Sequence, residues 1–167
     1  MWEAGQIMYE ICMATESDRN EILKLYKAQI GRESCPWTDH YPENDTIDFD
    51  LARNSLFVMK EEGRIIGTVS VDEDENTDNL ECWSSELYPG GELSRLAVLP
   101  EEQGRHLAAE LLKFGMKELK RRGFKSIHFL VNKHNHKAIS AYSTLEFNIV
   151  GECYLYEQEF LCYEKEL

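Results

Sequence analysis

The chain has 167 residues, with 18 Lys and Arg against 31 Asp and Glu, and a formal net charge of −13. This length is typical of one domain, and 43% hydrophobic residues suffice for a core, so we expect a single domain over residues 1–167. The negative charge argues against nucleic acid or an anionic membrane as a partner, because phosphate binding needs clustered Lys and Arg. It is compatible with a cationic amine substrate, although acidic surfaces often serve solubility alone.

The composition also bears on the compartment. No window of about 18 apolar residues occurs, so no membrane span is expected. Residues 1–6 lack the basic and apolar regions of a secretory signal. The five cysteines are scattered, and none forms a Cys-x-x-Cys pair. Together these features predict a cytoplasmic protein with reduced thiols and no structural zinc.

The first elements follow from spacing and turn residues. We expect a strand at residues 9–13 and then a helix that begins with a capping box at residues 15–18 and stops at Gly31. Residues 32–42 are rich in Pro, Trp, His and Tyr and predict an irregular loop, followed by a short helix at residues 46–53.

A hairpin comes next. Residues 56–60 and 65–71 read as two strands joined by a turn at Glu62-Gly63, and Gly67 inside the second strand indicates a bulge. The acidic stretch at residues 72–78 predicts an exposed loop.

The second half contains the clearest helix. After a break at residues 89–91 we expect a strand at 92–98, and an amphipathic helix at 104–121 that Gly123 ends. A strand at 127–131 completes a strand–helix–strand unit, which predicts a right-handed parallel crossover. The last elements are expected at residues 135–145 (helix), 148–156 and 160–166 (an antiparallel strand pair).

The junction between the strand at 92–98 and the helix that follows is the most informative feature. A helix that starts directly after a strand and a turn points its free N–H groups at one spot, and the helix dipole favours negative charge there. The junction therefore predicts a site for a phosphate-bearing ligand.

Two sequence motifs in this part of the chain resemble those of a known protein family. The junction resembles the acetyl-CoA-binding motif of the GNAT superfamily of N-acetyltransferases, Gln/Arg-x-x-Gly-x-Gly/Ala after a strand ending in Leu-x-Val-x-Pro. Gln103 and Ala108 match its first and last positions, and His106 stands where the family usually has Gly. A second stretch, residues 135–147, resembles the family's Asn-x-x-Ala-x-x-x-Tyr-x-x-x-Gly-Phe, with Glu146 in place of Gly. The matching residues of this second motif are Asn135, Ala138, Tyr142 and Phe147.

The resemblance implies a mixed α/β fold, the GNAT fold: a mostly antiparallel six- to seven-stranded sheet with one parallel splayed pair and helices on both faces. It implies acetyl-CoA as co-substrate, no metal and a possible homodimer. Main-chain amides from Gly104 to Ala108 would hold the pyrophosphate, strand residues would pair with the pantetheine arm, and Asn135 would bind near the splay. The implied cofactor-binding residues are Leu96, Ala97, Val98, Gln103, Gly104, Arg105, His106, Leu107, Ala108, Asn135, Ala138 and Tyr142.

The implied reaction is the attack of a neutral amine on a thioester. Tyr142 is the candidate acid for the departing thiolate, since a phenol with a pKa near ~10 is protonated at neutral pH. Its alternative reading is a tyrosine packed on the core face of a helix. A main-chain N–H of residues 96–98 could stabilise the oxyanion.

The candidate base is Glu92, because strand alternation places it on the same face as Ser94 and Leu96. Its alternative reading is a solvated carboxylate. His40 is a second candidate base in the loop expected to form the substrate wall, although a loop histidine can simply be exposed. Trp37 and Tyr41 either line a substrate pocket or anchor that loop.

Metal binding is not expected, because His134 and His136 lie two residues apart at a turn and diverge, with no evident carboxylate partner. The sequence thus favours an acetyltransferase that uses a small-molecule or peptide amine. Two alternatives remain open: a non-catalytic CoA-binding or sensor module, and a protein-interaction domain on the same scaffold.

Overall fold

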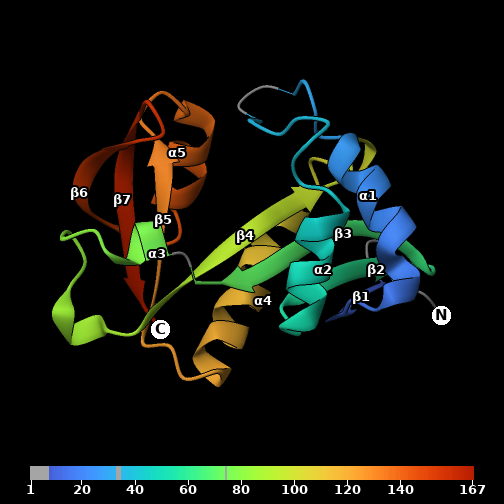
Figure 1. Cartoon of the computed structure of the whole chain (residues 1–167), viewed down its shortest axis with the longest axis horizontal. Coiled ribbons are helices and arrows are strands. Elements are labelled where there is room, and N and C mark those ends of the chain that lie inside the picture. The colour runs from blue at the N-terminus through green and yellow to red at the C-terminus, as the bar shows by residue number, and fades with distance from the viewer. Residues whose placement is uncertain (1–7, 33–34, 74) are drawn as a thin grey trace. The chain divides into compact units, whose positions relative to one another are not determined.

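A computed structural model describes residues 8–32, 35–73 and 75–167. Its elements are labelled in Figure 1. Their bounds are β1 (Tyr9–Met13), the 3-10 helix η1 (Glu16–Asp18), α1 (Arg19–Lys27), α2 (Asn44–Ala52), β2 (Leu56–Glu61), β3 (Arg64–Asp72), α3 (Glu75–Asp78), η2 (Ser85–Leu87), β4 (Gly90–Val98), η3 (Pro100–Glu102), α4 (Leu107–Arg121), β5 (Ser126–Asn132), α5 (His136–Ser143), β6 (Asn148–Leu155) and β7 (Gln158–Glu166).

The strands form one seven-stranded sheet in the order β1-β2-β3-β4-β5-β7-β6. The pairs β1–β2, β2–β3, β5–β7 and β6–β7 are antiparallel. β4 and β5 pair in parallel where both strands begin, Gly90 with Ser126 and Gly91 with Ile127. This arrangement confirms the predicted fold class, a mixed α/β fold with a mostly antiparallel sheet and one parallel pair.

Internal contacts divide the chain into two compact units. The first comprises Met1–Ser70 and Ser94–Gly115, and the second comprises Val71–Leu93 and Met116–Leu167. The chain passes between the units within β3, β4 and α4. The single domain expected from chain length stays a prediction, and each unit is described by itself.

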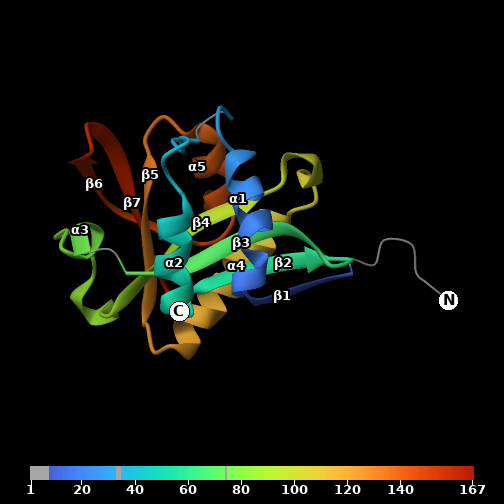
Figure 2. The ribbon, with the colours of Figure 1, turned by 45° about the vertical axis from the view of Figure 1, so that its right-hand side comes forward.

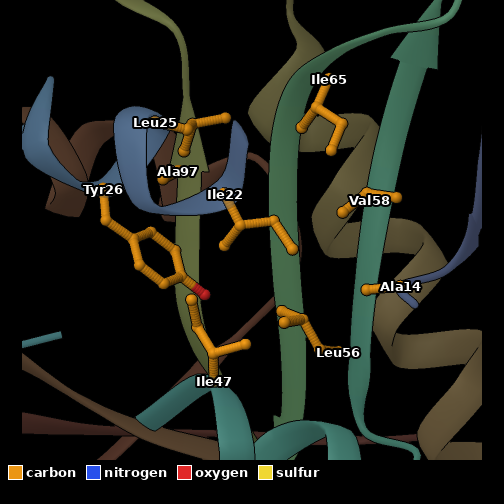
Figure 3. Packing of buried hydrophobic residues seen from close by; sticks show 9 residues of the cluster. All are labelled: Ala14, Ile22, Leu25, Tyr26, Ile47, Leu56, Val58, Ile65 and Ala97. Atoms are coloured by element: carbon orange, nitrogen blue, oxygen red, sulfur yellow. The ribbon is translucent and has the colours of Figure 1, made fainter. Parts of the chain in front are cut away.

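In the first unit, α1 and α2 cover one face of the strands. Ile22, Leu25 and Tyr26 recur at helical spacing on α1 and are at most 1% exposed. They pack with Ile47 of α2 and with alternate residues of β2, such as Val58 (Figure 3). The apolar stripe of α1 therefore fixes that helix on this face of the sheet.

The opposite face of the same strands packs against α4. Phe57 alternates with Val58 on β2, and its ring meets Phe114 of α4 edge-on, with the centroids 5.0 Å apart. A Cβ at Gly67 would lie 2.8 Å from Leu111 Cδ1, so a glycine is needed for this close approach. Met59 pairs with Gly67 but Lys60 pairs with Ile65, which confirms the predicted bulge at this glycine.

In the second unit, α5 lies beside β5 (Figure 2). The ring of Phe129 on β5 contacts Tyr142 of α5, Phe147 after that helix, and Tyr163 on β7, with centroids 4.9, 5.0 and 5.7 Å away. This aromatic cluster holds α5 to one face of the β5–β7 pair. By strand alternation, His128 and Glu164 point to the other face.

The structure corrects three predictions. The acidic stretch at residues 72–78 is not only loop, because its last four residues form the short helix α3. The helix expected from Gly104 begins at Leu107. Gly104 and His106 instead have left-handed backbones, with φ of 83° and 60°, which a regular helix does not contain. The helix expected at residues 46–53 begins two residues earlier, at Asn44, after a capping box between Glu43 and Thr46.

Candidate functional site

The chain between β4 and α4 forms the predicted anion-binding junction. The first hydrogen bond of α4 runs from the Glu110 amide to the His106 carbonyl, at 3.3 Å. The amides of residues 107–109 therefore precede the helical ladder and have no intrahelical acceptor. They lie just after the left-handed residues Gly104 and His106, both exposed. Such a helix start can hold a phosphate group.

Arg105 fixes this junction with its side chain. Its guanidinium donates to Glu61 on β2 and to Glu102 on η3, each at 2.6 Å. The side chain thereby ties the loop to the sheet of the first unit. We expected Arg105 to contact the phosphate through its main-chain amide. Its side-chain ion pairs do not involve that amide, so the contact stays a prediction.

The carboxyl-terminal half of β4 is irregular at Arg95, whose φ is 51°. This left-handed residue interrupts the pleat, so the alternation predicted from Glu92 through Ser94 to Leu96 does not continue across it. Further along, Leu96 is half-buried, whereas Ala97 and Val98 are buried. The Val98 carbonyl, expected at the pantetheine arm, accepts a hydrogen bond from Gln29 Nε2 at 2.9 Å.

A buried ion pair holds Arg95 in this conformation. Its guanidinium makes a bidentate pair with Asp50 of α2, at 2.6 and 2.7 Å, and donates to the Tyr41 hydroxyl at 3.2 Å. The Asp50 side chain is fully buried. Sequence reasoning missed this pair; the one available signal was an arginine in the middle of a predicted strand.

The three residues expected at a substrate wall have different surroundings in the first unit. Trp37 is half-buried, and its ring lies 5.3 Å from that of core residue Tyr26, a contact that suits a loop anchor. Its role in a substrate pocket stays a prediction. Tyr41 is 48% exposed, and its hydroxyl is the Arg95 partner. The His40 side chain is 93% exposed, with Nδ1 3.8 Å from Glu43. The base role of His40 stays a prediction.

In the second unit, Tyr142 is half-buried within the aromatic cluster around Phe129. Burial raises the pKa of Tyr142, and the nearby Tyr163 raises it further. Tyr142 is thus packed against other aromatic residues, as the alternative to a catalytic role expected. A raised pKa also keeps the phenol protonated, as an acid requires.

Asn135 and Ala138 begin α5. The Asn135 side chain caps the helix by accepting the Ala138 amide at 3.1 Å. The spacing Asn-x-x-Ala of the second motif therefore has a local structural reason, the N-cap of a helix. Contact of either residue with a cofactor stays a prediction.

Glu92 is half-buried near the start of β4. A Cβ at Gly91 would meet Leu119 and Phe124, whereas one at Gly90 would meet His128. Since strand residues alternate, Glu92 shares the face of Gly90 and His128. Sequence reasoning did not single out His128, although a histidine alternating with apolar residues in a strand was a visible signal.

The described ranges contain neither a metal-ligand cluster nor a membrane-spanning helix. Among residues 8–32, 35–73 and 75–167, no group of three or more His, Cys, Asp or Glu side chains is arranged to hold a metal. No helix in the same ranges is long and apolar enough to cross a membrane.

Comparison with known proteins adds independent findings. Residues 20–147 match the model of the Acetyltransferase (GNAT) family. No curated protein matches the chain. An N-acetyltransferase from Staphylococcus aureus Mu50 is similar with a TM-score of 0.72 and 19% identity, over 95% of this chain and 98% of that one.

Two further solved structures have the same fold. YncA from Salmonella typhimurium, solved with its cofactor acetyl-CoA, gives a TM-score of 0.73 and 19% identity, over 96% of this chain and 94% of that one. The ribosomal-protein-S18-alanine N-acetyltransferase from Escherichia coli gives a TM-score of 0.69 and 17% identity, over 95% of this chain and 94% of that one.

Proposed function

Because the chain belongs to the acetyltransferase (GNAT) family, we propose that it transfers an acetyl group from acetyl-CoA to a primary amine of a small molecule or peptide, by direct attack of the amine on the thioester. Family membership confirms the predicted enzyme class, a GNAT-type N-acetyltransferase. The identity of the acceptor and of the catalytic residues belongs to the proposal, as do a cytoplasmic location and a homodimer.

The observation that carries the cofactor proposal is the backbone of His106. This residue stands at the glycine of the first motif and has the left-handed φ of 60° that glycine adopts readily. A conformation that suits glycine is therefore kept at this position of the motif although the side chain differs, which supports the proposal. His106 is exposed, so its imidazole does not fill the interior of the loop.

We assign the binding of acetyl-CoA to the predicted residues. The amides from Gly104 to Ala108 would hold the pyrophosphate, with Gln103 beside them. Main-chain groups of residues 96–98 would align the pantetheine arm, as an added strand does. Asn135, Ala138 and Tyr142 would complete the site.

Two side chains are assigned to proton transfer. Tyr142, whose burial favours the protonated phenol, would donate a proton to the departing thiolate. Glu92 would accept the proton that the amine loses, directly or through water. When bound, acetyl-CoA supplies the activated acyl group, and these residues supply only binding and protons.

The cofactor test removes one amide from the helix start. Ala108→Pro deletes an N–H in the first turn, where proline is tolerated. We expect acetyl-CoA affinity, measured by calorimetric titration, to fall at least about tenfold, the loss of one charge-assisted hydrogen bond. The control is Asp45→Pro, which makes the same change at the second residue of α2 and should leave the affinity unchanged. Equal affinities in the three proteins would rule out this helix start as the phosphate site.

The catalytic test measures thiol release with a panel of amines. The protein should release thiol from acetyl-CoA with some amines, and Tyr142→Phe should lower kcat because it removes the assigned proton donor. Glu92→Gln should lower the rate most at low pH, where unassisted deprotonation of the amine is scarce. Binding without turnover would favour a sensor module, and absence of binding at high micromolar acetyl-CoA would favour an interaction domain.

A further inference from the structure

The second unit contains a hollow of about 500 Å³. It is bounded by the segment that joins β3 to β4 and by the first residues of β4 and β5. Trp83 and Tyr88 supply aromatic surface, while Asp78 and Glu164 supply carboxylates. Neither the cofactor motif nor the aromatic cluster around Tyr142 contributes to this lining.

One wall is a histidine held by three neighbours. His128 is 3% exposed, and its ring stacks on Trp83 with centroids 4.4 Å apart and an interplanar angle of 11°. Its Nε2 lies 2.7 Å from Asp78 Oδ1. With the proton on Nε2, that bond fixes the tautomer, and Nδ1 is left as an acceptor.

Nδ1 faces a place that only a glycine leaves open. A Cβ at Gly90 would lie 2.5 Å from His128 Nδ1 and 2.9 Å from Ser126 Oγ. Any other residue at position 90 would therefore collide with the imidazole. The glycine thus lets His128 and Ser126, both buried, line the hollow side by side, and the Ser126 hydroxyl donates to the Leu87 carbonyl at 2.8 Å.

A buried carboxylate lies next to this histidine. Glu164 is the ladder partner of His128 on β7 and is 2% exposed. Its Oε1 accepts from the Ser84 hydroxyl at 2.6 Å, and its Oε2 accepts from the Ser84 amide at 3.0 Å. Each carboxylate oxygen can accept a second hydrogen bond, so the group retains acceptor capacity toward a ligand.

The charge of the lining selects the ligand. Glu73, Asp78 and Glu164 border the hollow, and the lining residues that the structure describes include no Lys or Arg. Trp83 adds a π-face of the kind that attracts cations. Such a site stabilises a bound ammonium group, and it repels a carboxylate or phosphate.

We infer that this hollow binds the charged ammonium group of the acceptor, and that the acceptor is accordingly a diamine or a longer polyamine. An amine held among Glu164, Asp78 and Trp83 stays protonated, because nearby carboxylates favour the charged form. A protonated amine has no lone pair and cannot attack a thioester. The reacting nitrogen must then be a second amino group of the same molecule. This inference rests on the proposed function for the identity of the ligand as acceptor.

The test begins with binding in the absence of acetyl-CoA. We expect 1,4-diaminobutane to bind measurably by calorimetry, and 4-aminobutanoate, which replaces one ammonium with a carboxylate, to bind at least tenfold more weakly. Glu164→Gln keeps an oxygen acceptor for Ser84 and removes the negative charge. This variant should lower the affinity for the diamine at least tenfold. The matched control, Glu152→Gln, removes an exposed β6 carboxylate that pairs with Lys133 and should change nothing.

Two further variants test the hollow in case Glu164→Gln does not fold. Trp83→Leu removes the aromatic wall, and Asp78→Asn alters a carboxylate with 29% side-chain exposure. Both should raise the KM for the diamine at least tenfold while acetyl-CoA affinity stays the same. Thermal unfolding of each variant shows whether the fold is intact.

The outcomes separate this inference from the proposed function. Thiol release with monoamines and no diamine binding would overturn the hollow as an acceptor site and leave the acetyltransferase in place. Equal diamine affinity in the wild type, Glu164→Gln and Trp83→Leu would overturn it as well. Diamine binding that these variants abolish, in a protein that does not bind acetyl-CoA, would support the cation site and refute the enzymatic function.

Discussion

His106 and Glu146 stand at the two positions where the GNAT motifs usually have glycine, and both have left-handed backbones, with φ of 60° and 61°. This conformation costs an L-residue about 1–2 kcal/mol relative to the right-handed one. We expect His106→Gly and Glu146→Gly each to raise the free energy of unfolding by about 0.5–1 kcal/mol, since the greater freedom of glycine in the unfolded chain offsets part of the gain.

Urea unfolding measures this gain, and Ala141→Gly is the control. Residue 141 is exposed within α5. Glycine there should lower the stability by about 1 kcal/mol, because a helix interior disfavours it. A loss of stability in His106→Gly comparable to that of the control would show that position 106 is not left-handed in solution.

Asp50 and Arg95 form the other residue-scale feature, a pair whose side chains are 0% and 6% exposed. Asp50→Ala leaves the Arg95 guanidinium buried without its carboxylate, and we expect a loss of about 3–5 kcal/mol in urea unfolding. Asp50 also pairs at 2.9 Å with Arg53, whose side chain is 31% exposed. The double variant Asp50→Leu, Arg95→Met removes both charges of the buried pair, keeps the partly exposed Arg53, and should recover much of that loss. Glu101→Gln, in an exposed pair with Arg64, should change the stability by no more than about 0.5 kcal/mol. A double variant as unstable as Asp50→Ala would mean that the pair stabilises by more than mutual neutralisation.

At the scale of elements, the start of η1 and α1 makes stability depend on pH. Burial alone would raise the pKa of Asp18, but the Thr15 amide and the Lys60 ammonium outweigh it, so this pKa lies below its ordinary value. A depressed pKa stabilises the fold above the unfolded-state pKa of about 3.9, and this contribution disappears as the pH falls through the folded-state value. We therefore expect Asp18→Asn to unfold at a lower temperature than the wild type at pH 7.

The same variant should begin to approach the wild type as the pH falls below about 4, where the unfolded carboxylate becomes protonated, and should reach it once the pH falls below the depressed folded-state pKa. Thermal unfolding in steps from pH 7 to 3 measures the convergence. Asp39→Asn, in an exposed loop, should follow the wild-type curve throughout. Parallel curves for Asp18→Asn and the wild type would exclude Asp18 as a source of the acid sensitivity.

The elements also show what the sequence could and could not predict. Strands expected at residues 56–60, 65–71 and 127–131 end within one residue of their observed bounds, because alternation and turn residues are local signals. The predicted start of α4 was wrong by three residues, because a histidine in the sequence does not indicate the left-handed backbone that His106 adopts. The pairing of His128 with Glu164 was not predictable either, because it depends on the register between β5 and β7, which neither strand encodes alone.

The candidate site likewise has one part that the sequence could predict and one part that it could not. The helix start that we propose as the anion site was recognisable because its residues are contiguous between Gln103 and Ala108. The hollow was not recognisable, because Asp78, Trp83, His128 and Glu164 come from four separate segments. Contiguous motifs therefore pointed to the cofactor that we propose, and only the folded chain brought together the residues that we assign to the acceptor.

For the whole molecule, the net charge of −13 should act with opposite sign on the two proposed substrates. A negatively charged protein attracts a cationic amine and repels the anionic acetyl-CoA, and salt weakens both effects as the Debye length falls to about 8 Å at 0.15 M. Raising NaCl from low to physiological concentration should increase the KM for the diamine and decrease the KM for acetyl-CoA, while kcat stays constant. Sucrose at matching osmolality should shift neither value. A parallel change of both KM values would attribute the salt effect to the fold rather than to the charge, and would remove the electrostatic argument for a cationic acceptor.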